Sequence, residues 1–135
     1  LYQARLMVAD CVLLLCALLD TRTMADYLAL CDDLGLAALV EAHDEKEVAS
    51  AVAAGARIIG GNNRNLGDFS VNLDNAARLR DRVPPGVLYV AESGVHRPAD
   101  VAAVRAMGAD GVLIGEALMR AKDKSAMLNQ FRRSV

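Results

Sequence analysis

The greatest concentration of side chains able to bind or transform a ligand lies between Ile58 and Leu66, a segment that reads IIGGNNRNL. Its apolar start changes abruptly into Asn62, Asn63 and Arg64, which offer amide donors, amide acceptors and a bidentate cation. Such a set suits a small anionic ligand that is rich in oxygen. The segment alone leaves a second interpretation open, because Asn and Gly are also common in turns with solvated side chains.

Polar residues also follow three other short apolar runs in the sequence. The carboxyl ends of parallel strands share one edge, and ligands bind at that edge in both αβ-barrels and open α/β sheets. The pattern therefore predicts one functional site, built from Glu41, Asn62, Arg64, Glu92, Ser93, Gly115 and Glu116.

Two carboxylates in this set have the type expected of acid–base catalysts. Glu41 directly follows an apolar run, so we interpret it as a partly desolvated general base. Each carboxylate has a simpler explanation: Glu41 as a solvated residue beyond a strand, and Glu92 as an ion-pair partner of Arg64. His43 is interpreted as a solvated or helix-capping residue rather than a catalyst.

Two glycine-containing turns are candidates for binding phosphate. Ser93-Gly94 and Gly115 follow the last two apolar runs, and Gly allows the backbone to approach an anion closely. Glu116 is unexpected here, since a carboxylate repels phosphate unless its side chain points away. Ser93-Gly94 also remains open to interpretation as an ordinary turn.

The elements that position these residues follow a repeated pattern of a helix, a Gly, a small residue and a short apolar run. The glycines are typical of helix ends that lead into strands, and Val8-Ala9-Asp10 departs from the pattern at the first repeat. Alternating strands and helices require a parallel sheet, either a barrel or a doubly wound sheet. The predicted strands are Cys11–Leu15, Ala37–Val40, Arg57–Gly60, Val87–Ala91 and Gly111–Ile114.

Helix boundaries are also marked in the sequence. Thr23 is a plausible cap for the helix that ends at Asp33, and Asp44 with Glu47 resembles a capping box. Asn72 is the expected cap of a helix over 73–82, and Pro98 is expected at the first position of another.

Composition restricts the functional classes. The 135 residues are enough for one domain, and a net charge of −2 gives no attraction toward nucleic acid or an anionic membrane. The longest apolar run, Cys11 to Leu19, is about half of a membrane span. The cysteines are odd in number and lie in apolar surroundings, so we expect three buried thiols, no metal site and a cytoplasmic location.

The motifs together resemble the indole-3-glycerol-phosphate synthase family. The similarity extends over essentially the whole chain and is carried by LVEAHD from Leu39, by IIGGNNRNL from Ile58, by AESGV from Ala91 and by VLIGEALM from Val112. The family is a (β/α)8 barrel. The resemblance therefore implies a partial TIM barrel of five parallel βα units, a single domain over 1–135 that corresponds to strands four to eight, with strands one to three absent.

The resemblance also implies an activity, without metal or organic cofactor. The family closes the indole ring of 1-(2-carboxyphenylamino)-1-deoxyribulose 5-phosphate with loss of CO2 and water. Position by position, Glu41 matches the general base, Asn62 a substrate-positioning residue, Arg64 an anion-binding residue and Glu92 a second catalytic carboxylate, while the matches to the phosphate-binding loops are Ser93, Gly94, Gly115 and Glu116. Gly61 replaces a bulky aliphatic residue of the family, which predicts looser packing behind Asn62.

The family's lysines, including its general acid, lie on strands that precede Leu1. We therefore expect this chain alone to bind phosphate weakly and to turn over negligibly, and to self-associate through the two sheet edges of an incomplete barrel. Two other interpretations stay open: a non-catalytic phosphate-binding half-barrel, and another phosphate-binding barrel such as phosphoribosylanthranilate isomerase.

Overall fold

The computed structural model describes residues 1–64 and 74–134, and its centre is a single five-stranded parallel sheet. The strands lie side by side in the order in which they occur in the sequence. Their bounds are β1 Cys11–Leu15, β2 Ala37–Ala42, β3 Ile58–Asn62, β4 Leu88–Glu92 and β5 Gly111–Leu113.

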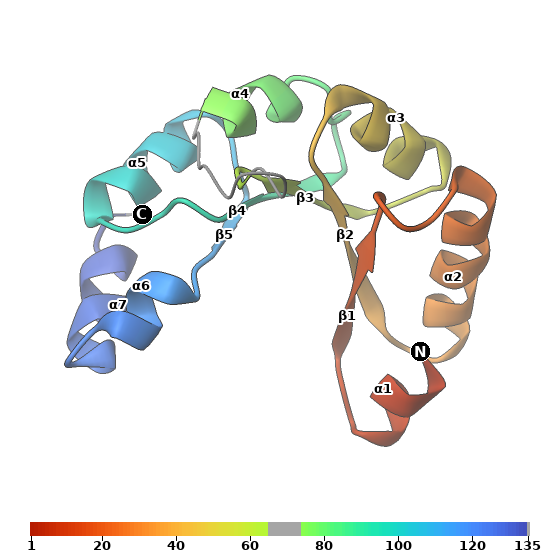
Figure 1. Cartoon of the computed structure of the whole chain (residues 1–135), viewed down its shortest axis with the longest axis horizontal. Coiled ribbons are helices and arrows are strands. Elements are labelled where there is room, and N and C mark those ends of the chain that lie inside the picture. The colour runs from red at the N-terminus through yellow and green to blue at the C-terminus, as the bar shows by residue number, and fades with distance from the viewer. Residues whose placement is uncertain (65–73, 135) are drawn as a thin grey trace.

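Helices connect the strands and all lie on one side of the sheet or at its ends (Figure 1). Sequential strand order sends each right-handed crossover to the same face, which excludes a doubly wound sheet and produces part of a barrel. The sheet curves into an arch with helices on its convex side. The helices are α1 Tyr2–Leu6, α2 Thr21–Asp33, α3 Glu45–Ala53, α4 Asp74–Arg80, α5 Pro98–Ala106, α6 Glu116–Arg120 and α7 Lys124–Arg132.

Three strands extend beyond the ends expected from the sequence. β2, β3 and β4 each continue for one or two residues, so Glu41, Asn62 and Glu92 belong to the strands themselves. The ladder explains this difference, because Cys16 N–H donates to Glu41 O at 3.1 Å and Asn63 N–H donates to Glu92 O at 2.9 Å. Backbone hydrogen bonds between adjacent strands therefore continue past the apolar residues and include Glu41, Asn62 and Glu92.

The helix starts agree only partly with the sequence prediction. Asp20, not Thr23, caps α2: its carboxylate accepts the Thr23 backbone N–H at 2.8 Å. Asp44 caps α3 as predicted, accepting from Glu47 N–H at 2.8 Å. Pro98 occupies the first turn of α5 as predicted, whereas the cap predicted at Asn72 lies outside the described residues.

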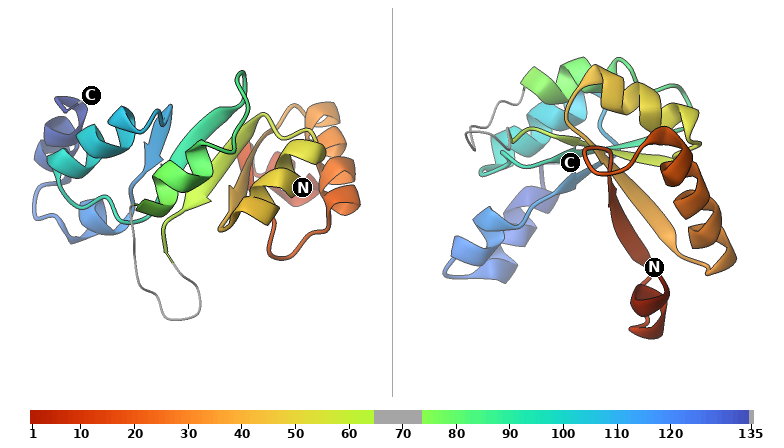
Figure 2. Two further views of the ribbon diagram at one scale, coloured as in Figure 1. Left: turned by 90° about the horizontal axis from the view of Figure 1, so that it is seen from above. Right: turned by 45° about the vertical axis from the view of Figure 1, so that its right-hand side comes forward.

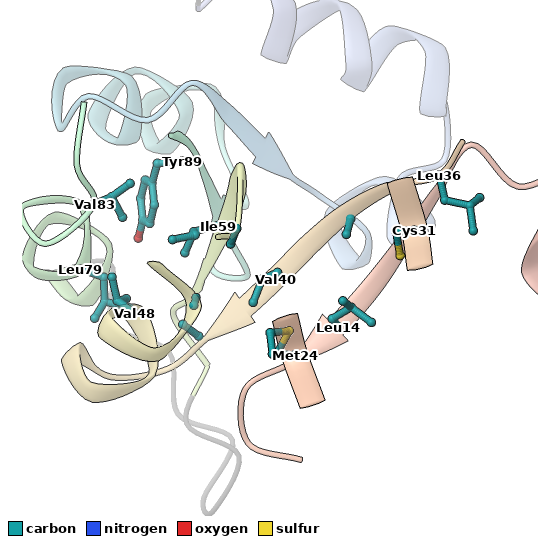
Figure 3. Packing of buried hydrophobic residues seen from close by; sticks show 14 residues of the cluster. Leu14, Met24, Cys31, Leu36, Val40, Val48, Ile59, Leu79, Val83 and Tyr89 are labelled. Atoms are coloured by element: carbon teal, nitrogen blue, oxygen red, sulfur yellow. The ribbon is translucent and has the colours of Figure 1, made fainter. Parts of the chain in front are cut away.

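The sides of the strands that face the helices form the core. Ile59 and Tyr89 are fully buried against Val48, Leu79 and Val83 (Figure 3). A second cluster under α5 and α7 includes Phe131.

The packing behind Asn62 is not loose, contrary to the expectation from Gly61. The Tyr89 ring fills that space, since a Cβ at Gly61 would lie 2.6 Å from Tyr89 Cζ.

No helix of the described residues covers the opposite, concave side of the sheet (Figure 2). Alternation along the strands points Leu13, Leu88 and Leu113 to this side, where each is about half exposed at 51%, 51% and 49%. Cys11 is exposed as well, contrary to the expectation that all three cysteines are buried. In the part of the chain described by the structure, β1 and β5 each have a neighbour on one side only.

Within residues 1–64 and 74–134, no helix combines the length and the apolar character needed to cross a membrane.

Candidate functional site

The register of the sheet brings the predicted carboxylates to one rim. Glu41 on β2 is paired with Gly60 on β3, and Asn62 on β3 is paired with Glu92 on β4. All four positions face the concave side, because residues two apart along a strand share a face. The rim thus places Glu41 and Glu92 on either side of a strand that carries no side chain at Gly60.

Gly60 is what makes room for Glu92. A Cβ at this position would overlap Glu92 Oε1 and lie 2.8 Å from its carboxyl carbon. Glu92 is 4% exposed, and its Oε1 has no hydrogen-bond partner among the described residues. Burial, together with hydrogen bonding and charge repulsion from Glu41, raises the pKa of Glu92 to about 8. The pair therefore contains a proton at neutral pH.

His43 lies directly beside Glu41. Its Nε2 is 3.3 Å from Glu41 Oε1, and its Nδ1 is 3.3 Å from Glu47 Oε2. The Glu47 carboxylate also accepts the His43 backbone N–H at 2.7 Å, so Glu47 contacts both the backbone and the imidazole of His43. His43 Nε2 has no hydrogen-bond partner among the described residues, so the ring lies close to the Glu41 carboxylate without a hydrogen bond to it.

The end of β3 is tied to its neighbours by amide side chains. Asn62 Oδ1 accepts the Arg64 backbone N–H at 2.9 Å, and Asn63 Nδ2 donates to Ser93 O at 3.1 Å. From α4, Asn75 Nδ2 donates to Asn62 O at 3.0 Å and more weakly to His43 O at 3.4 Å. These bonds fix the relative positions of three rim segments.

A pocket of about 200 Å³ lies next to this rim, between the ends of β4 and β5. Ser93 and Gly94 both adopt positive φ, 62° and 83°, so the chain turns sharply at the pocket edge. The remaining lining residues are Arg64, Val95, His96, Leu113, Ile114, Gly115 and Glu116.

The sequence left open an ion pair between Arg64 and Glu92, but the structure has a different pair at the pocket. Arg64 pairs with Glu116, at 3.2 Å between Nη2 and Oε2, and not with Glu92. The other Glu116 oxygen accepts from Arg120 Nε at 3.0 Å. The Glu116 side chain is thus directed toward two arginines.

Burial raises the pKa of two cysteine thiols, those of Cys16 and Cys31. Burial raises the pKa of Cys16 to about 11, with Glu47 adding to the shift, so its thiol stays protonated at neutral pH. Among the residues that the structure describes, no group of three or more His, Cys, Asp and Glu side chains is arranged to hold a metal ion.

The structure gathers Glu41, Asn62 and Glu92 at the rim, and Arg64, Ser93, Gly94, Gly115 and Glu116 around the adjoining pocket, while Asn65 and Leu66 lie outside the described residues. Sequence reasoning missed the contacts of His43 with Glu41 and of Asn75 with the rim. The capping-box spacing of Asp44 and Glu47 indicated that Glu47 reaches back to the start of α3, where it contacts His43, but it gave no signal for the contact of His43 with Glu41. No signal pointed to Asn75.

Comparison with known proteins gives the family of the chain. The family model described as "Indole-3-glycerol phosphate synthase" matches residues 1–131. The chain belongs to the indole-3-glycerol phosphate synthase family. A protein of that name from Ruminiclostridium cellulolyticum is 54% identical over 135 residues, and one from Leuconostoc mesenteroides is 46% identical over 132. These alignments cover 100% and 98% of this chain but 52% and 50% of the relatives, so the chain spans about half their length.

Solved structures agree on the architecture of this family member. A 3-hexulose-6-phosphate synthase from Salmonella typhimurium matches with a TM-score of 0.81 at 18% identity, covering 98% of this chain and 66% of that one. A thiamine phosphate pyrophosphorylase from Pyrococcus furiosus matches with a TM-score of 0.78 at 20% identity, covering 97% and 61%. At such identities the likeness concerns the fold alone, and it confirms the partial barrel.

Proposed function

We propose that this chain supplies the base, the anion-binding residues and the phosphate pocket of an indole-3-glycerol-phosphate synthase, a carboxy-lyase of tryptophan biosynthesis. The observation that carries the proposal is the rim itself. Glu41 lies beside a Glu92 that retains its proton at neutral pH, and the cation of Arg64 lies at the adjoining pocket. The substrate is 1-(2-carboxyphenylamino)-1-deoxyribulose 5-phosphate, which carries both a carboxylate and a phosphate.

The assigned roles follow from the charge states of the rim. Glu41, which lies beside His43, takes the proton that the cyclised and decarboxylated intermediate loses from carbon as its hydroxyl group leaves and the indole ring becomes aromatic. Glu92 faces the same region in its neutral form and therefore donates a hydrogen bond rather than adding a second negative charge. Asn62 positions the substrate, and Arg64 neutralises one of its anionic groups.

The phosphate group occupies the pocket between Ser93-Gly94 and Gly115. Its volume of about 200 Å³ is large enough for one such group, and both turns lie at its edge. α6, with five residues, is too short to contribute a substantial dipole, so Arg64 is the principal positive charge of the pocket.

Loss of hydroxide from the cyclised intermediate requires a general acid, which the resemblance assigns to a lysine, and no lysine lies on a described strand of the rim. Lys46 is on α3, Lys124 is on α7, and Lys122 lies between α6 and α7, all away from the rim. This chain has no counterpart of barrel strands one to three of the family fold. We propose that those strands supply the lysines that act as general acids and that they cover the exposed leucines. The complete barrel acts in the cytoplasm, and the present chain alone turns over negligibly. Because the described rim has no lysine, a second candidate function applies to the chain in isolation, namely that of a non-catalytic half-barrel that binds phosphate.

The proposal is tested by co-expressing this chain with the complementary N-terminal half of the Ruminiclostridium cellulolyticum relative. We expect the assembled pair, but not either part alone, to form indole-3-glycerol phosphate, as measured by indole fluorescence. Glu41→Gln should lower the turnover of the assembled pair by at least about 100-fold, the scale of a lost general base.

Glu45→Gln provides the matched control, since Glu45 is an ion-paired surface glutamate of α3. It should leave turnover within about two-fold, as is usual for exposed ion pairs. Normal turnover by the isolated chain contradicts the requirement for the missing strands. A folded but inactive assembly leaves the phosphate-binding half-barrel as the better description.

A further inference from the structure

The pocket contains an ion pair between two of its lining side chains, Arg64 and Glu116. Its ionisable side chains among the described residues are Arg64, His96 and Glu116. Arg64 Nη2 and Glu116 Oε2 are 3.2 Å apart, and their side chains are 30% and 45% exposed. The carboxylate therefore contacts the cation that an anionic ligand would need.

Glu116 has a second partner that does not line the pocket. Arg120, one turn further along α6, donates to the other Glu116 oxygen at 3.0 Å. Loss of the Arg64 contact would therefore leave Glu116 paired. Exposed ion pairs contribute little to stability, so one partner can be exchanged for another at small cost.

We propose that Glu116 holds Arg64 in place while the pocket is empty, and that the phosphate of the ligand displaces the Glu116 carboxylate from Arg64. Glu116 is then a positioning residue rather than a phosphate ligand, and its carboxylate remains on Arg120 after the exchange. The inference rests on the proposed function, because it takes the pocket to be the phosphate site. It accounts for a carboxylate at a place where phosphate is expected to bind.

The exchange makes a quantitative prediction, because phosphate must compete with the Glu116 carboxylate for Arg64. Removing this competitor should raise the affinity for inorganic phosphate by about two- to five-fold, the range that corresponds to an exposed ion pair. The gain should depend on Arg64. Removal of a merely repulsive charge would instead raise the affinity whether or not Arg64 is present.

The test is a double-mutant cycle on the 135-residue chain, with Glu116→Gln, Arg64→Gln and both together. Inorganic phosphate is titrated at constant ionic strength, and the backbone amide NMR signals of Ser93, Gly94 and Gly115 report binding. The Arg64 Nε–H signal should shift in the free protein on Glu116→Gln, and on phosphate addition in the wild type. Glu45→Gln serves as the control, because Glu45 also bridges two arginines but on α3.

We expect Glu116→Gln to tighten phosphate binding when Arg64 is present and to change it by less than about 1.5-fold when Arg64 is Gln. Equal gains in both backgrounds, or weaker binding by Glu116→Gln, overturn the exchange while leaving the phosphate site intact. Failure of every variant to bind phosphate at these signals contradicts the phosphate site and the exchange together. Loss of turnover by the assembled enzyme, in contrast, bears on the proposed function alone.

Discussion

Glu92 is the residue whose chemistry is most altered by its surroundings. Its pKa is raised to about 8 from an ordinary value near 4.5, first by burial and then by Glu41. The folded protein therefore keeps a proton that the unfolded chain releases between these pH values. This carboxyl stabilises the fold fully below pH 4.5, and its contribution is lost as the pH rises through 8.

Glu92→Gln should remove this pH dependence, because an amide does not ionise. We expect the fall in unfolding free energy between pH 5 and pH 9 to be about 1–3 kcal/mol smaller than in the wild type. Urea unfolding at pH 5, 7 and 9 measures it. Glu41→Gln should lower the pH at which the wild-type loss occurs, since it removes the neighbouring charge. Wild-type and Glu92→Gln profiles that run parallel would show that the proton is absent.

Val8 gives a second prediction at the scale of single residues. It adopts a φ of 60° at the first connection, the left-handed conformation that Gly35 and Gly108 take at later helix ends. A β-branched residue is strained there, by about 1–2 kcal/mol. Val8→Gly should therefore raise the unfolding free energy by about 0.5–1.5 kcal/mol in urea. Val12→Gly, inside β1, should lower it instead.

At the scale of elements, the sequence predicted the strands and most helices because each depends on local pattern. The apolar runs, each preceded by a glycine except the first, suffice to locate β1 to β5. The ends of β2, β3 and β4 were placed too early, because residues such as Glu41 and Asn62 are polar in type and only the neighbouring strands show that their backbones remain in the ladder. The end of β5 was placed one residue too late, at Ile114 instead of Leu113. The Arg64–Glu116 pair joins residues 52 apart and had no signal in spacing.

The fit between β3 and β4 is the tightest of these non-local features. Gly61 has no side chain where Tyr89 packs, and the Tyr89 hydroxyl donates to Ala76 O on α4 at 3.0 Å. Gly61→Ala should lower the unfolding free energy by about 1–3 kcal/mol, because the added methyl overlaps the ring. In a Tyr89→Leu background the same change should cost at least about 1 kcal/mol less. Equal costs in both backgrounds would place the strain elsewhere.

At the scale of the whole molecule, the concave face and two free strand edges dominate the behaviour expected of the chain. Leucines that are half exposed line that face from β1 to β5, and edges with unpaired backbone groups favour pairing with other chains. We therefore expect the isolated chain to associate with itself in sedimentation velocity experiments at micromolar concentrations.

Leu13→Ser combined with Leu88→Ser should weaken that association by removing apolar area from the concave face. The control is Leu128→Ser, because Leu128 is similarly exposed at 45% but lies on α7. The complementary N-terminal half should also suppress self-association, since it competes for the same face. A wild-type chain that sediments as a well-ordered monomer would contradict the prediction.

The two adjacent glycines of β3 also have a consequence for the order of folding. At Gly60 and Gly61 the strand has no side chains of its own, and the space on its two faces is filled by Glu92 and Tyr89 of β4. β3 therefore gains little from forming before β4 arrives, across a separation of about 30 residues. The backbone amides of the two strands should become protected from hydrogen exchange in a single step, which makes this pair the slow, cooperative unit of the half-barrel.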